Sequence, residues 1–462
     1  MPGSVASGAA TLLLARIIPP IASFGVFYLA VVHWGPDAWG LFHLLLSVHA
    51  VLQMVAGLGT DLMVLQRVSA QRRELPPLLR AVSGLLFRTG LFFGAAMVAV
   101  AWSLSSNNEV RLAAVWFGAA LPASSLSPAL EAAWISLGRT HRVATVVLCE
   151  HGLRVFGSFI ALSMGGGPAA LAFVLFGSKW LGTALLLLPL RKIEGSPEPI
   201  GFATLAKQVS PFALYFVVTA FLGRIDSLSL SVFRPLNDVG YYGTAIRLVF
   251  LPTIASQVFG IALYPHLAKA GRVPERFDRL LRVGLLTLCA LSFIPAALFI
   301  AFAEPVLHLL RMEDYLPAAP ILALLAFALP AWFSTEVLFR ALVAKERLGD
   351  CLRAAAIQVG LGVAAMVWAT KMYGTEGAAA AAVAVAWLGT VVYSCFLLRE
   401  SAVWLQAWLL VLLIGATVIG GSHALAAMHP DYALTLIGMY TFATLAWGVV
   451  YRDELSVLID VN

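Results

Sequence analysis

The sequence predicts an all-α polytopic membrane protein of about fourteen transmembrane helices, arranged as two six-helix lobes around a central cleft plus two C-terminal helices. Composition is the first reason. Of the 462 residues, 61% are hydrophobic and 12% are charged, against about 25% charged residues in soluble proteins. The mean hydropathy is +0.90. The second reason is that the apolar segments run for ~20 residues or more, the length that spans a bilayer as a helix.

Six apolar segments make up the predicted N-terminal lobe, residues 1–195. The first segment lacks the basic flank of a signal peptide and is long enough to span, so we expect it to remain a membrane helix. Short polar or glycine-containing stretches separate the segments. The helices are predicted at about 8–32, 38–58, 82–104, 111–137, 144–164 and 168–190.

A polar stretch at 194–199, with the sequence EGSPEP, predicts a linker between the lobes. The C-terminal lobe is predicted to cover residues 196–398, and two further helices to occupy residues 399–462. We expect the lobe helices at about 207–232, 238–264, 280–304, 317–343, 353–371 and 375–397, and the last two at 403–426 and 430–450.

The charges of the loops orient these helices. With a cytoplasmic N-terminus, the inner loops and tail carry nineteen Lys or Arg residues and the outer loops carry four. The positive-inside rule therefore places both termini in the cytoplasm, and the net charge of +6 does not indicate nucleic-acid binding. The loops are too short for a soluble catalytic domain. There is no G-x-x-x-x-G-K-[S/T] nucleotide loop, so we predict a non-enzyme. The four outer cations are Arg111, Arg234, Arg311 and Lys371.

The chain carries signs of an internal repeat. The segment PDAWGLF at 36–42 is matched by NDVGYY at 237–242, each at the start of an apolar segment. Pro122 and Pro330 are separated by the same 208 positions as Arg139 and Arg347. Because each unit has six helices, both copies would enter the membrane in the same orientation, as in a parallel-repeat transporter.

Seven Lys or Arg residues lie inside the apolar segments, where a charge costs roughly 2.5–3.5 kcal/mol. For Arg88 and Arg340, near the inner surface, we expect snorkelling or pairing. The others either pair with acids or line a wet cationic cleft for an anionic cargo. Arg154 has Glu150 one turn away, Lys179 has no acid at that spacing, and Arg16 could instead snorkel. The candidate cargo-binding cations are Arg16, Arg154, Lys179, Arg224 and Arg247.

No metal site or cofactor is predicted, because the four cysteines do not have metal-ligand spacing. Three acids within the apolar segments are candidates for coupling transport to an ion: Glu131, Glu150 and Asp226.

Several motifs in order resemble one family. They are AWGLF at 38–42, GLG at 57–59 with LQR at 65–67, VGYYGTAIRL at 239–248 and LYPHL at 263–267. They are similar to the Wzx-type oligosaccharide-lipid flippases of the multidrug/oligosaccharidyl-lipid/polysaccharide exporter superfamily, over nearly the whole chain. This family has fourteen helices arranged as 6 + 6 + 2.

The resemblance implies a function. It is the translocation of an undecaprenyl-pyrophosphate-linked oligosaccharide from the cytoplasmic to the periplasmic leaflet of the bacterial inner membrane, for exopolysaccharide or O-antigen lipopolysaccharide biosynthesis. The implied partners are that lipid, membrane lipids, and polysaccharide polymerase and export proteins. Two alternatives stay open, a cation-coupled multidrug exporter of the same superfamily and a membrane subunit of a polysaccharide synthase or export complex. The exporters of this superfamily carry an acid in their first helix, and segment 8–32 here has none.

Overall fold

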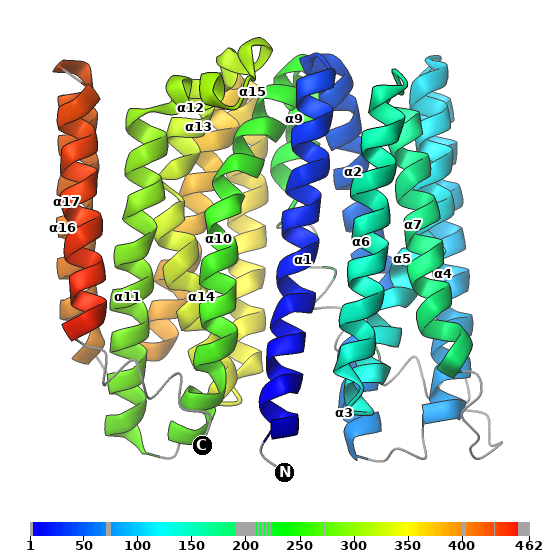
Figure 1. Ribbon diagram of the computed structural model, residues 1–462, viewed down its shortest axis with the longest axis horizontal. Coiled ribbons are helices and arrows are strands. Elements are labelled where there is room, and N and C mark those ends of the chain that lie inside the picture. Colours follow the sequence, from blue (N-terminus) through cyan, green and yellow to red (C-terminus); the bar gives the residue numbers. More distant parts are fainter. Residues whose placement is uncertain are drawn as a thin grey trace. The chain divides into compact units, whose positions relative to one another are not determined.

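The computed structural model describes residues 3–70, 75–190, 223–271, 273–398, 403–428 and 430–450, with the single residues 209, 213, 217 and 220 between them. Within these ranges every regular element is a helix (Figure 1). Nine of the described helices are long and apolar enough to cross a membrane, and one bent pair makes a tenth. The predicted all-α membrane fold is confirmed. Nearly half of the predicted segment 207–232, one of the fourteen, lies outside the described residues.

The chain forms two compact units. The first comprises Met1–Ser231 and Pro235–Gly240, and the second comprises Val232–Arg234 and Tyr241–Asn462. The lobe boundary predicted at 195/196 lies outside the described part of the chain, and the one predicted at 398/399 coincides with the end of the described range 273–398.

Six long helices and two short ones make up the described part of the first unit, and most of the long helices begin and end close to the predicted positions. Asn107 caps one of them, because its side chain accepts a hydrogen bond from the backbone N–H of Glu109. Glycines with positive φ, Gly138 (74°) and Gly165 (76°), follow two helix ends. The helices are α1 (Gly3–His33), α2 (Pro36–Gly57), α3 (Thr60–Ala70), α4 (Leu75–Leu104), α5 (Asn108–Ser136), α6 (Thr140–Ser163), α7 (Pro168–Leu190) and α9 (Ile225–Phe233).

Helix α3 lies where the sequence predicts an inner loop. Its Thr60 hydroxyl donates to the carbonyl of Gly57, across the turn that ends α2. Met63, Val64 and Val68 are buried in a cluster with residues of α4, α5 and α6. Hydropathy alone does not detect α3, because its charged residues lower the average over a segment that still buries one apolar side.

Helix α5 is the central helix of the first unit, and α2, α3, α4, α6 and α7 all pack against it. It packs closely on α4, where a Cβ atom on Gly94 would collide with the carbonyl oxygen of Gly118. Pro122 has no N–H to donate to that carbonyl. Small residues let two membrane helices approach this closely. The α4–α5 crossing holds α5 in place, and α6 and α7, which carry the candidate site, pack against α5.

The first turn of α10 (Leu236–Ala270) belongs to the first unit and packs on the first turn of α2. The two contacts are reciprocal: a Cβ atom on Gly40 would collide with the carbonyl of Leu236, and one on Gly240 with the carbonyl of Pro36. Pro36 and Leu236, like Gly40 and Gly240, are 200 positions apart in the sequence, so the contact involves the two segments matched in the predicted repeat.

The second unit contains the other described helices. Helix α11 packs against α13, α14, α16 and α17, and α14 packs against α15 (Figure 1). Pro274 stands at the first turn of α11, where its missing N–H costs no helix hydrogen bond. The helices are α11 (Pro274–Ala301), α12 (Ala303–Leu309), the 3-10 helix η2 (Glu313–Ala318), α13 (Ala319–Ala326), α14 (Leu329–Ala344), α15 (Leu348–Leu398), α16 (Val403–Met428) and α17 (Pro430–Val450).

One predicted span is broken in the structure. Segment 317–343 divides into η2 with α13 and then α14, which are bent by 44°. Pro330, in the first turn of α14, cannot continue the hydrogen bonding of the preceding helix. Two predicted spans, 353–371 and 375–397, run through α15, where the backbone leaves helical geometry at Gly374 (φ 67°, ψ −138°).

Candidate functional site

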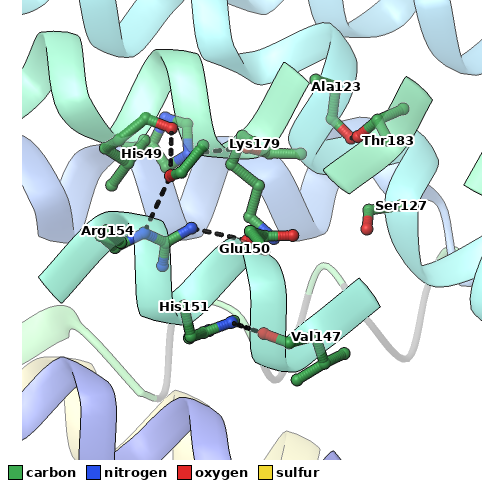
Figure 2. A network of polar contacts seen from close by, with 12 residues as sticks. His49, Ala123, Ser127, Val147, Glu150, His151, Arg154, Lys179 and Thr183 are labelled. Carbon is green, nitrogen blue, oxygen red and sulfur yellow. Dashed lines mark hydrogen bonds and ion pairs between the residues drawn. The ribbon is translucent and has the colours of Figure 1, made fainter. Parts of the chain in front are cut away.

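The first unit holds a three-residue charge cluster between α6 and α7 (Figure 2). The Glu150 carboxylate on α6 accepts from Arg154 Nη2 at 2.6 Å and from Lys179 Nζ, on α7, at 2.8 Å. Both cations meet the same oxygen, Oε1. We call Glu150, Arg154 and Lys179 the α6–α7 cluster. It is an ion pair extended by a second cation.

Local sequence explains why these groups meet. Glu150 and Arg154 are one helical turn apart, so their side chains lie on the same side of α6. On α7, Gly182 faces the Glu150 carboxylate, and a Cβ atom there would collide with Oε2. Gly157 of α6 similarly accepts Val174 of α7, with 3.0 Å from its ideal Cβ position to a methyl carbon. The glycines bring the two helices close enough for Lys179 to reach across.

Ser178 fixes the guanidinium of the cluster. Its hydroxyl accepts from Arg154 Nε at 3.2 Å and donates to the carbonyl of Leu175 at 3.0 Å. Arg154 therefore uses Nε and one N–H of Nη2. Among the described residues, Nη1 of Arg154 and the remaining N–H groups of Lys179 have no partner. These donors are available to a further acceptor.

Burial within the cluster is graded. The side chain of Glu150 is 3% exposed, whereas those of Arg154 and Lys179 are 14% and 17% exposed. The carboxylate thus lies behind the two cations. With two positive charges and one negative charge, the cluster carries a net charge of about +1 in a partly desolvated place, where electrostatic interactions are stronger than in water. This arrangement is suited to binding an anion.

Buried histidines flank the cluster (Figure 2). His49 of α2 donates from Nδ1 to the carbonyl of Phe117 at 3.1 Å, and its Nε2 lies 3.2 Å from the hydroxyl of Ser124. A carbonyl can only accept, so the ring takes the Nδ1–H form and Ser124 donates to Nε2. His151 lies beside Glu150 and donates to the carbonyl of Val147 at 3.1 Å. Both rings are tied to backbone, which makes them supports for packing.

Two of the candidate cations form ion pairs in the structure. Arg154 pairs locally with Glu150, and Lys179 finds its acid on another helix, so both are paired and both keep exposed surface. The expected pair of Arg340 with Glu336 is also present, at 2.8 Å. Arg88 is exposed on α4.

The remaining candidates are not placed in the cluster. Arg16 belongs to α1, but its side chain lies outside the described part of the structure. Arg224 is half-buried just before α9, and Arg247 is half-buried on α10 in the second unit. Their role in cargo binding stays a prediction.

The acids proposed for ion coupling differ in their surroundings. Glu131 lies on α5 and accepts from the Ser127 hydroxyl at 3.3 Å. Asp226 accepts from the backbone N–H of Ser227 at 2.6 Å. Glu150 is held by two cations. Within the described residues, no three His, Cys, Asp or Glu side chains are grouped so that they could hold a metal ion.

Sequence reasoning missed Ser178 and Gly182. Each is adjacent to the cluster only because α6 and α7 pack together, and no spacing rule connects them to Glu150. A glycine three positions after a lysine within an apolar segment is a weak sign of close helix packing.

The whole chain has the fold of a known class of membrane transporter. It matches the lipid II flippase MurJ in an inward closed conformation with a TM-score of 0.72 and 14% identity, covering 97% of this chain and 99% of that one. It matches an inward-facing multidrug resistance MATE family transporter of the MOP superfamily with a TM-score of 0.66 and 14% identity, covering 85% and 100%. A MOP superfamily transporter from Pyrococcus furiosus matches with a TM-score of 0.63 and 13% identity, covering 87% of this chain and 96% of that one. At these identities the likeness establishes the fold.

The family follows from the sequence itself. A model of the polysaccharide biosynthesis protein family matches residues 34–320, more than half of the chain. The protein belongs to this family. A search of curated protein sequences finds no match. Family and fold together confirm the predicted resemblance to the polysaccharide flippases of the superfamily. The family is one of polysaccharide biosynthesis, and the fold is that of multi-pass membrane transporters.

Proposed function

We propose that this protein translocates an undecaprenyl-pyrophosphate-linked oligosaccharide from the cytoplasmic to the periplasmic leaflet, and that the α6–α7 cluster binds its diphosphate. The observation that carries the proposal is the pair of partly exposed cations, Arg154 and Lys179, with unused N–H groups in front of one buried carboxylate. Guanidinium and ammonium groups bind phosphate oxygens through charge-assisted hydrogen bonds.

The rest of the mechanism follows the plan of a two-lobed transporter. The lobes, at 1–195 and 196–398, alternate access to the two leaflets, and the segment 399–462 adds two helices. Arg16, Arg224 and Arg247 contribute further positive charge to the cleft. Glu131 and Asp226 are the acids that remain for ion coupling, because Glu150 is committed to its cations. No covalent bond of the cargo is made or broken.

Charge argues against a cationic drug as the cargo. A site with two cations and one acid repels a cation, since like charges at close range cost free energy. The Pyrococcus furiosus relative is described as having a binding pocket of reverse polarity that suggests a different function. The positive cluster in the present chain likewise argues for a function other than the export of cationic drugs. The proposal places the protein in a bacterial inner membrane with both termini in the cytoplasm. Its proposed protein partners are a polysaccharide polymerase and export proteins.

A genetic experiment tests this function. Deleting the gene should make lipid-linked oligosaccharide accumulate in the cytoplasmic leaflet, as measured by its accessibility to a membrane-impermeant glycosidase. The intact gene should restore outward movement, and a copy carrying Arg154→Ala should restore less. Unchanged leaflet distribution after deletion, together with a new sensitivity to cationic dyes, would instead support the drug exporter.

A further inference from the structure

The role of Glu150 is not explained by anion binding alone, since a carboxylate beside two cations weakens their hold on a phosphate. A single substitution could remove the carboxylate, yet the packing around Glu150 accommodates it. Gly182 leaves room for Oε2, and Ser178 orients Arg154 toward Oε1. The carboxylate is the most buried member of the cluster. These contacts indicate that the negative charge is part of how the site works.

We propose that Glu150 is an internal counter-ion that determines which anion the α6–α7 cluster holds and how tightly, an inference that rests on the proposed function. In the structure Glu150 balances one of two cations. The net charge left over, about +1, offsets only part of the charge of a diphosphate. A sugar joined to the lipid through a single phosphate carries one negative charge, and a sugar joined through a diphosphate carries one on each phosphate.

The counter-ion has two consequences. Arg154 and Lys179 are held together on one oxygen, so both cations stay close to the same point. Their attraction for phosphate is also reduced, because each interaction with the incoming anion is opposed by repulsion from Glu150. A translocase must release its cargo, so an attraction limited in this way favours turnover over tight holding.

Charge arithmetic gives a set of four proteins for the test. The net charge of the cluster is about +1 in the wild type, +2 in Glu150→Gln, 0 in Lys179→Gln, and +1 again in the double variant. The amide of Gln keeps the size of the side chain. The matched control is Glu336→Gln, which removes the carboxylate of a pair with a single cation, Arg340, in the second unit.

Binding is measured with purified full-length protein in lipid nanodiscs. The two probes are a prenyl-diphosphate-linked N-acetylglucosamine and a prenyl-monophosphate-linked glucose. Glu150→Gln should lower the Kd for the diphosphate probe about tenfold or more and the Kd for the monophosphate probe by less. In proteoliposomes, the KM and the kcat of Glu150→Gln for the diphosphate probe should both fall, because tighter binding slows release. Glu336→Gln should leave both Kd values unchanged.

The double variant keeps the test decisive if Glu150→Gln does not fold. Lys179→Gln retains the Glu150–Arg154 pair and should bind the diphosphate probe about tenfold more weakly than the wild type. Adding Glu150→Gln to it should restore the wild-type Kd.

The outcomes separate the two claims. A wild-type protein that binds neither probe contradicts the proposed function. If the wild type binds the diphosphate probe but Glu150→Gln leaves its Kd unchanged or raises it, or the double variant fails to recover, the counter-ion inference is wrong and the proposed function stands.

Discussion

Transport of the diphosphate-linked cargo should be lost, by a factor on the order of a hundred or more, when Lys179 is replaced by Glu. Two charges about 5 Å apart in a site of intermediate polarity interact by on the order of 3 kcal/mol, and a hundredfold effect needs about 2.7 kcal/mol. The substitution removes one attraction and adds a repulsion, since the cluster would then hold two carboxylates and one guanidinium. The rate of outward movement in proteoliposomes measures the effect.

Other substitutions at the same position distinguish charge from shape. Lys179→Arg keeps the cation and should retain most of the transport rate. Lys179→Met keeps the length of the side chain without its charge, and its transport rate should lie between those of the Arg and Glu variants. Equal rates for the Met and Glu variants would show that charge at this position does not act on the cargo. Each variant is compared only after size-exclusion chromatography shows a folded monodisperse protein.

Removal of the carboxylate should instead destabilise the fold. Glu150→Leu leaves Arg154 and Lys179 close together without their common acceptor, and breaking a buried ion pair in this way typically costs about 3–5 kcal/mol. We expect a clear drop in the midpoint of thermal unfolding in detergent. Adding Lys179→Met to Glu150→Leu removes one of the stranded cations and should recover part of the loss.

The pair in the second unit supplies the comparison. Glu336 and Arg340 are more exposed, at 18% and 27%, and among the described residues Glu336 pairs with one cation. Glu336→Leu should therefore lower the unfolding midpoint by less than Glu150→Leu. An equal effect at both positions, or no recovery in the double variant, would mean that the α6–α7 cluster does not depend on its shared carboxylate.

Much of the fold could be predicted because hydropathy and helix length report directly on the bilayer. The segments 144–164 and 168–190 were predicted within a few residues of α6 and α7. The break between α13 and α14 was missed because a bend at Pro330 leaves average hydropathy unchanged. Helix α3 was missed because its apolar side is seen only when the cluster around Met63 and Val64 is packed.

The candidate site also depends on packing that the sequence does not reveal. The pairing of Arg154 with Glu150 could be considered from the sequence, since one helical turn separates them. The contact of Lys179 with the same oxygen could not, because it depends on how closely α6 and α7 approach at Gly182. Sequence reasoning treated pairing and cargo binding as alternatives. The structure shows the pairing, and the proposed function adds cargo binding by the same two cations, since one acid cannot neutralise both.

A structure of the protein with a diphosphate-linked oligosaccharide lipid bound would test the central claim most directly. The account predicts phosphate oxygens roughly 2.7–2.9 Å from nitrogen atoms of both Arg154 and Lys179, the distance of a charge-assisted hydrogen bond. A diphosphate bound elsewhere, with both side chains still engaged only by Glu150 and Ser178, would contradict it.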